Sequence, residues 1–252
     1  EAAQQAARAA TKPVHIVVAD GVYPLSRSLI FDGQDSQVTW KAAAGAKPVF
    51  HGGIAVTGWT KAEGGLWKAV LPDKSWHFEQ LWIDGRRATR ARTPNKGYLH
   101  ITDAVRANVF ADLKENMNFH AFSVAPEHYQ LLKNIPEAQR NDALITVTHA
   151  WAVGQCRIKA LDDATHAVQI KGRARYPFVE FEPDQRYWME SFRSALDAPG
   201  EWFLDREKGE VLYHPLLGED MTKVEVIAPV VEKFLIMKGA KDISFNGISF
   251  HF

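Results

Sequence analysis

The sequence predicts an all-β protein in which coils of a parallel β-solenoid are interrupted by an antiparallel insert. Short apolar runs separated by glycine turns, with no helices between them, occur in residues 13–56 and again in residues 224–252, a pattern typical of stacked coils or of a sandwich. The chain between them holds longer alternating runs joined by hairpin turns. The closing stretch DISFNGISFHF keeps an apolar residue at almost every second position, as a strand with one buried face does.

These patterns of apolar runs and turns divide the chain into four segments. Residues 1–12 are strong helix formers that end before a proline, and we expect a short capping helix there. Residues 13–56 hold the first coils, residues 57–223 hold the insert, and residues 224–252 resume the solenoid. Because each coil of a solenoid buries its face only against its neighbours, a last coil without a cap predicts further coils after Phe252.

Turn signals place the elements of the insert. Asp84-Gly85 forms a two-residue turn between EQLWI and RRATRAR, which predicts a hairpin. PEHYQLLKN has a proline in its first turn and predicts a short helix. Residues 143–172 predict three strands, and EWFLD and EVLYHP predict a second hairpin through Lys208-Gly209.

Composition restricts the class of partner. The 252 residues are 46% hydrophobic and 24% charged, which is ordinary for a globular protein with a sizeable core. Thirty basic residues balance thirty acidic ones, so nothing favours a nucleic-acid or membrane-surface partner, and a neutral molecule fits better. No apolar stretch is long enough to predict a membrane-spanning helix. The single cysteine, Cys156, excludes an intrachain disulfide and favours a buried structural thiol over a nucleophile.

The arginines after the first hairpin are candidates for binding. Arg90 and Arg92 alternate around Ala91, so a strand would place both on one face, just before Asn95 in the segment TPN. A guanidinium group is a planar fork of donors that suits sugar hydroxyls or carboxylates. The alternative is a solvated edge of the sheet, where charges prevent edge-to-edge pairing.

Aromatic side chains are the second type of candidate, because sugar rings stack on aromatic faces. His149 with Trp151, and Tyr187 with Trp188, are the pairs of interest, although packing is favoured over a stacking platform even for Trp151. A pair of carboxylates is the requirement for glycoside hydrolysis. Glu180 and Glu182 would share a strand face, but a solvated face explains them better than catalysis. The histidines show no metal-binding spacing.

Several motifs carry a resemblance to a known group. They are the hairpin QLWIDGRRATRARTPNKGYL, the segment HAW at residues 149–151, the string DAPGEWFLDREKGEVLYHPLLGEDMTKVEVIAP, and the closing rung ISFNGISF. In these segments the chain resembles the right-handed parallel β-helix carbohydrate-active proteins of the glycoside hydrolase family 141 type. That group includes α-fucosidases and xylanases.

The resemblance implies a fold, an activity and a set of site residues. The fold would be the first coils of a right-handed, pectate-lyase-like β-helix, interrupted by the antiparallel insert. The activity would be hydrolysis of plant or other complex polysaccharide by a secreted or periplasmic enzyme without a cofactor or metal. Its catalytic carboxylates would lie on later coils after Phe252, so this amino-terminal part would need those coils as a partner. The expected substrate-binding residues are Arg90, Arg92, Asn95, His149, Trp151 and Tyr187.

Two alternatives remain open from the residues. A polysaccharide lyase on the same solenoid would use an Arg or Lys base and usually Ca²⁺ held by a cluster of Asp residues. A non-catalytic β-helix would only bind glycan, as an adhesin or scaffold does, because a fold does not determine a function.

Overall fold

The structure is a computed structural model of residues 1–252, and it describes residues 1–105, 109–113, 117–179 and 184–252. These residues form two compact units. Unit 1 consists of Glu1–Thr57, Phe78–Arg87 and Glu225–Phe252, and unit 2 consists of Gly58–His77 and Ala88–Val224.

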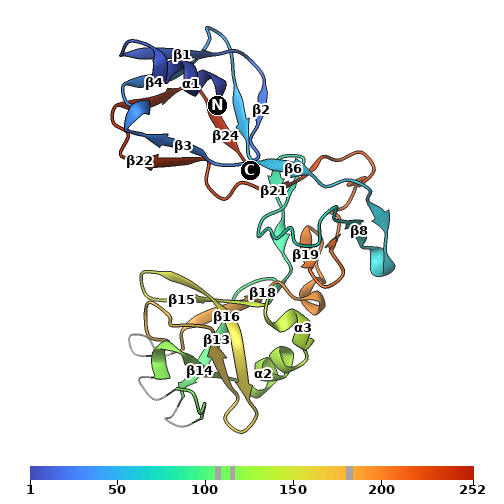
Figure 1. The fold of residues 1–252 in the computed structure, drawn as a ribbon. Coiled ribbons are helices and arrows are strands. Elements are labelled where there is room, and N and C mark those ends of the chain that lie inside the picture. The colour runs from blue at the N-terminus through green and yellow to red at the C-terminus, as the bar shows by residue number, and fades with distance from the viewer. Residues whose placement is uncertain (106–108, 114–116, 180–183) are drawn as a thin grey trace. The chain divides into compact units, whose positions relative to one another are not determined.

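Unit 1 contains three short parallel ladders that join strands from both ends of the chain, coloured blue and red in Figure 1. The chain runs through these ladders in the same order each time. The first ladder is β1 (Val14–Val18), β4 (Val38–Ala42) and β23 (Ile243–Asn246). The second is β2 (Val22–Pro24), β5 (Val49–His51) and β24 (Ser249–His251). The third is β3 (Leu29–Asp32) and β22 (Leu235–Lys238).

Aromatic side chains stack along these ladders in register. Trp40 of β4 pairs with Phe245 of β23, and their rings lie stacked with centroids 6.1 Å apart. In the second ladder Phe50 contacts Tyr23 on one side and Phe250 on the other, at 5.7 and 5.4 Å between centroids. The pairing of residues 38–41 with residues 243–246 confirms that the two glycine-punctuated regions share a sheet.

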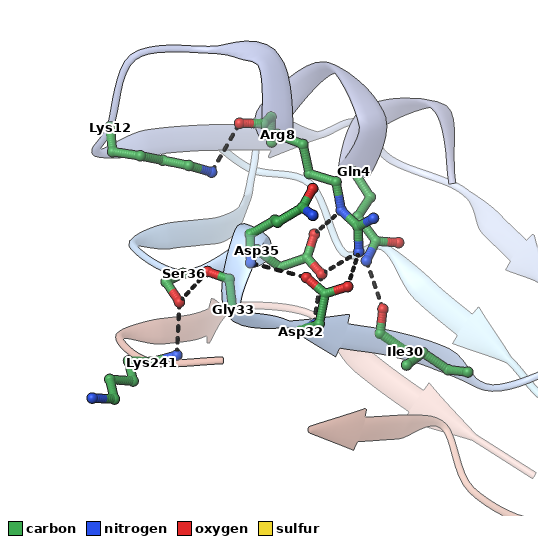
Figure 2. A network of polar contacts seen from close by, with 11 residues as sticks. Gln4, Arg8, Lys12, Ile30, Asp32, Gly33, Asp35, Ser36 and Lys241 are labelled. Carbon is green, nitrogen blue, oxygen red and sulfur yellow. Dashed lines mark hydrogen bonds and ion pairs between the residues drawn. The ribbon is translucent and has the colours of Figure 1, made fainter. Parts of the chain in front are cut away.

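The predicted amino-terminal helix is confirmed as α1 (Ala2–Ala9), and a polar network ties it to the loop after β3 (Figure 2). The guanidinium group of Arg8 donates to both oxygens of Asp35 at 2.7 Å and to Asp32 at 3.1 Å. Asp35 ends the 3₁₀ helix η1 (Gly33–Asp35) and is only 2% exposed. The hydrogen bonds from Arg8 lower the pKa of Asp35 to about 2 despite its burial.

A four-stranded antiparallel sheet completes unit 1. Its order is β10 (Arg86–Arg87), β9 (Trp82–Ile83), β21 (Val226–Pro229) and β6 (Gly53–Ala55). The hairpin of β9 and β10 is confirmed, with Asp84 and Gly85 both at positive φ as its turn requires. Residues 78–87 lie inside the segment expected as the insert, yet they belong to unit 1, because β9 pairs with β21.

Unit 2 begins with a five-stranded sheet around the second predicted hairpin, which is confirmed as β19 (Glu201–Asp205) and β20 (Glu210–Tyr213). Gly209 takes positive φ in their turn and donates its N–H to Asp205 O at 2.8 Å. A short 3₁₀ helix, η2 (Glu63–Gly65), precedes β8. The sheet order is β11 (Thr89–Arg90), β19 (Glu201–Asp205), β20 (Glu210–Tyr213), β8 (Trp67–Val70) and β7 (Thr60–Lys61).

The rest of unit 2 is a closed barrel of six antiparallel strands. The ring closes because β18 pairs with both β13 and β15, and β12 adds a short strand beside β18. Three of the strands, β15 to β17, are those predicted within residues 143–172. The barrel strands are β13 (Leu99–Ala104), β14 (Ala121–Val124), β15 (Leu144–Thr148), β16 (Val153–Asp162), β17 (Ala167–Ile170) and β18 (Arg186–Glu190), and the short strand is β12 (Arg92–Thr93).

Large apolar side chains fill the barrel, and Phe122, Phe178 and Tyr187 are each 0% exposed. The predicted helix is confirmed as α2 (Pro126–Lys133), and α3 (Glu137–Arg140) follows it beside the barrel (Figure 1). Buried residues of α2 belong to the same apolar cluster as the barrel strands. The 3₁₀ helices η3 (Met117–Phe119) and η4 (Arg193–Ala195) complete the unit.

The protein is therefore mostly β, with short parallel sheets in unit 1 and an antiparallel barrel in unit 2. Of the helices in the described ranges, none has the length and apolarity needed to cross a membrane.

Candidate carbohydrate-binding site

Two surface regions of unit 2 contain most of the predicted site residues. The first, which we name the arginine cluster, consists of Arg90, Arg92, Tyr98, Trp188 and Glu190. Arg90 lies in β11 and Arg92 in β12, so the chain passes from one sheet to the other at fully buried Ala91. Both arginine side chains contact residues of β18.

Arg90 is largely withdrawn from solvent. Its Nε lies 3.9 Å from Oε1 of Glu190, and the two side chains are 13% and 11% exposed. The other carboxylate oxygen of Glu190 accepts a hydrogen bond from Oγ1 of buried Thr146 at 2.8 Å. Because a buried charge needs a partner, this pair explains why both side chains occur at the junction of β11, β18 and β15.

Arg92 and Asn95 lie nearer the surface. The guanidinium group of Arg92 lies over the ring of Trp188 at 4.9 Å from its centroid, and its Nε donates to Pro94 O at 3.1 Å. Tyr98, 46% exposed, lies beside Trp188 with 5.9 Å between centroids. Asn95 donates from Nδ2 to Asp197 at 2.8 Å. Arg90 and Arg92 thus both contact β18, whereas Asn95 contacts the loop before β19.

Glu201 supports this region, although the sequence analysis did not single it out. Its carboxylate is 3% exposed and accepts backbone N–H groups from Arg92, Asp197 and Ala198 at 3.2–3.3 Å. Burial raises the pKa of Glu201, and these N–H donors oppose the rise. The carboxylate therefore fastens the DAPG loop to β12. The signal in the sequence is a glutamate that opens the apolar strand EWFLD.

The second region is a pocket of about 640 Å³ between the β15–β16 turn and the segment after β17. We name it the basic pocket. Its lining includes two predicted site residues, His149 and Trp151, and several that were not predicted. The charged and aromatic residues that line it are His149, Trp151, Arg157, Lys171, Arg173, Arg175 and Tyr176.

The aromatic wall of the basic pocket is Trp151 and Tyr176. Trp151 is 63% exposed and meets Tyr176 edge-on with 5.5 Å between centroids. The sequence favoured packing for Trp151, but the structure leaves much of its ring accessible. His149 is 7% exposed and lies behind Tyr176, with its backbone N–H donated to Ala152 O at 2.7 Å.

Lys171, Arg173 and Arg175 form much of the rest of the wall, and their contacts are with neutral groups. Lys171 donates from Nζ to Oδ1 of Asn141 at 2.7 Å. The guanidinium group of Arg173 lies 3.8 Å from the ring centroid of Phe119, and that of Arg175 lies 5.6 Å from the ring centroid of Tyr176. The segment KGRARY, which supplies these side chains, carries three cations within five residues, and this is the signal that the sequence analysis did not use.

Tyr187 is the predicted site residue that the structure places in the core. It is 0% exposed inside the barrel, so it is not available to a ligand. The same burial raises the pKa of its hydroxyl group. The alternation of β18 explains this, because Tyr187 and Met189 point inward while Trp188 and Glu190 point outward. Glu180 and Glu182 lie outside the described residues.

Cys156 agrees with its predicted role as a structural thiol. It is 8% exposed in β16, and burial raises its pKa to about 11, so the thiol stays protonated at neutral pH. Within the described part of the chain, no three His, Cys, Asp or Glu side chains come together as a metal site would require.

Comparisons with known proteins identify the segment that carries both regions. The GH141 insertion domain matches residues 64–216, more than half of the chain. The chain belongs to the GH141 insertion-domain family. This confirms the resemblance that the motifs predicted.

A solved structure described as a glycoside hydrolase has the same fold as this GH141-like chain, with a TM-score of 0.77 at 24% sequence identity. The match covers 95% of this chain and 43% of the other, so the chain spans less than half the length of that hydrolase. A second structure, a complex of XylC with xylose, matches at 16% identity with a TM-score of 0.30, and the match covers 90% of this chain and 28% of the other. No curated protein matches the chain.

Proposed function

We propose that this chain is the amino-terminal part of a β-helix glycoside hydrolase that acts on plant or other complex polysaccharide. In this proposal unit 1 provides the first coils of a right-handed parallel β-helix, and unit 2 contributes glycan binding. The enzyme is secreted or periplasmic. The catalytic carboxylates lie on coils that follow Phe252.

One observation carries the proposal. The chain passes through the three parallel ladders of unit 1 in a repeating order, and the GH141 insertion domain interrupts this order. The chain passes β1, β2 and β3, then β4, β5 and β22, then β23 and β24, and unit 2 is inserted between β5 and β22. A chain that returns to the same parallel ladders in the same order forms stacked coils.

The buried carboxylates of the described chain support a catalytic site elsewhere. Glycoside hydrolysis uses two carboxyl groups about 5–9.5 Å apart, one of which gives up or takes a proton. Asp35 is paired with Arg8, Glu190 with Thr146 and Arg90, and Glu201 with three backbone N–H groups. Asp205, the fourth buried carboxylate of the described residues, accepts the backbone N–H of Lys208 and lies 3.5 Å from its Nζ. Each of these carboxylates therefore already has a structural role.

The open edges of the last strands support the continuation. In the described chain β23 pairs only with β4, and β24 only with β5. Phe245 and Phe250 are half-buried in the ladders, where they pack against Trp40 and Phe50. A further coil would cover these rings and pair with the free strand edges.

The test compares residues 1–252 with a longer polypeptide that includes the following coils. Release of reducing sugar from xylan, and of phenol from aryl α-fucosides and aryl xylosides, is measured for both. We expect activity only from the longer polypeptide. Turnover by residues 1–252 that is lost on Glu180→Gln or Glu182→Gln would contradict the proposal. An unsaturated product, detected by its ultraviolet absorbance, would instead identify a lyase.

A further inference from the structure

We propose that the basic pocket of unit 2 binds an anionic sugar unit, one that carries a carboxylate or a sulfate ester. This deepens the proposed function, on which it rests, by naming the charge of the glycan that unit 2 contacts. The binding itself needs no catalytic coil, so it is testable on residues 1–252.

The size and the aromatic wall of the pocket suit a sugar. Its volume of about 640 Å³ lies within the range of small-ligand sites, roughly 300–1,000 Å³. Trp151 is 63% exposed at its rim and is steadied edge-on by Tyr176. An accessible indole ring beside a pocket offers a flat apolar face to the C–H groups of a pyranose ring.

The charge of the wall identifies the ligand as an anion. Arg157, Lys171, Arg173 and Arg175 line the pocket, and no Asp or Glu is among the described residues that line it. The contacts of the last three are with an amide oxygen, a backbone carbonyl and aromatic rings, none of which neutralises a positive charge. Hydrogen bonds between ionised partners are roughly twice as strong as those between neutral groups. A carboxylate or sulfate therefore gains more from this wall than a hydroxyl group does.

The wall also combines segments that are separate in sequence. Trp151 comes from the turn after β15, Arg157 from β16, and the other cations from the segment after β17. The pairing of β16 with β15 and with β17 brings these segments together. The positive charge is thus concentrated around one cavity, although the whole chain has a formal net charge of zero.

The experiment is isothermal titration of residues 1–252 with three trisaccharides of equal length: trigalacturonate, neutral galactotriose and a sulfated galactotriose. We expect at least one of the anionic trisaccharides to bind about tenfold or more tightly than the neutral one, with an affinity that falls as salt is added. The carboxylate and sulfate arms show which anion the pocket prefers, and tight binding of either supports the proposal.

Variants test whether the pocket is the site. Arg173→Gln with Arg175→Gln is expected to weaken anionic binding about tenfold or more, and Trp151→Ala about threefold to tenfold. Lys61→Gln is the matched control for charge, because Lys61 is an exposed residue of β7 outside the pocket. Leu217→Ala is the control for loss of an exposed apolar side chain. Neither control should change binding, and circular dichroism checks that every variant is folded.

Three results would overturn the inference. The first is equal binding of neutral and anionic trisaccharides, which would leave a glycan-binding unit intact and remove only its charge preference. The second is no binding by any trisaccharide, while activity of the longer polypeptide still decides the proposed function. The third is binding of a single-stranded oligonucleotide at the same affinity and without dependence on Trp151, which would indicate a general polyanion surface.

Discussion

The two units bury their side chains in different ways. In unit 2 each strand of the ring has a neighbour on both sides, and Phe122, Ile145 and Phe178 are 0% exposed. In unit 1 β23 and β24 each have one described neighbour, and their rings, Phe245 and Phe250, are half-buried. A closed barrel completes its burial within itself, whereas a ladder buries a residue only as far as its neighbours extend.

The two units also differ in the partners of the charged groups described above. In unit 1 Arg8 is matched to Asp35 and Asp32, so its charge is used to hold α1 against the loop after β3. In unit 2 Lys171, Arg173 and Arg175 of the basic pocket contact neutral groups around a cavity. A charge that the fold neutralises contributes to stability, and one that the fold holds toward a cavity is available to a ligand.

We expect the largest loss of stability from a substitution in the core of the barrel, and a smaller one from a substitution in a ladder. Phe122→Ala should lower the free energy of unfolding of unit 2 by about 3–5 kcal/mol, because it leaves a cavity in a fully buried core. Phe245→Ala should cost unit 1 only about 1–2 kcal/mol, since its ring is half-buried. Urea titration followed by hydrogen exchange of peptides from each unit measures both changes separately.

Each of these two variants is the control for the other. Peptides from β14 and β17 should lose protection in Phe122→Ala and keep it in Phe245→Ala. Equal losses for the two substitutions would contradict the comparison, because the ladder would then be packed as completely as the barrel.

The sequence predicted the local parts of both units. Alternating apolar residues and glycine turns indicated β1, β4, β23 and both hairpins, because these signals lie within a few residues of one another. They also indicated that residues 13–56 and 224–252 share a sheet, since both regions consist of short apolar runs separated by glycine turns. Closure of the barrel was not predictable in this way, because β18 meets β13 and β15 through pairings between residues distant in sequence.

The candidate site was predicted in part for the same reason. Arg92 and Asn95 are only three residues apart, with Arg92 in β12 and Asn95 in the bend that follows it, so their proximity is a local feature of the sequence. The wall of the basic pocket combines Trp151 with Arg173 and Arg175, which only the pairings of β15, β16 and β17 bring together. The adjacent pair of Tyr187 and Trp188 predicts one aromatic surface, but neighbouring residues of a strand point to opposite faces, and Tyr187 points into the barrel.

A second, smaller effect is expected from loss of the ion pair between Arg8 and Asp35 in unit 1. The lowered pKa of Asp35, about 2, corresponds to roughly 1–2 kcal/mol of stability in unit 1 after allowance for solvent screening. A carboxyl group with a lowered folded pKa stabilises the fold above its unfolded pKa and loses that contribution as the pH falls. Arg8→Met should therefore destabilise unit 1 at pH 7, and the difference from the unmodified protein should shrink between about pH 4 and pH 2.

Urea titrations at several pH values between pH 7 and pH 2 measure this difference. Arg27→Met is the matched control, because Arg27 also pairs with a carboxylate, that of Glu1, but at the surface, with a side chain 73% exposed. No measurable change is expected for the control. A constant difference between Arg8→Met and the unmodified protein across the pH range would show that packing of the arginine stem, rather than the ion pair, holds α1.

The smallest expected effect concerns Arg92 of the arginine cluster, whose guanidinium group contacts an aromatic ring. The guanidinium group of Arg92 lies 4.9 Å from the ring centroid of Trp188, and an exposed cation–π contact contributes about 0.5–1 kcal/mol. A double-mutant cycle of Arg92→Met and Trp188→Leu, followed by urea unfolding, should give a coupling energy in this range. The same cycle on Arg186 and Tyr98, whose 5.2 Å contact joins two exposed side chains, should give less. A coupling of zero for the first pair would mean that Arg92 is held by its hydrogen bonds to Pro94 and Gly97 alone, and that its guanidinium group does not depend on the ring beneath it.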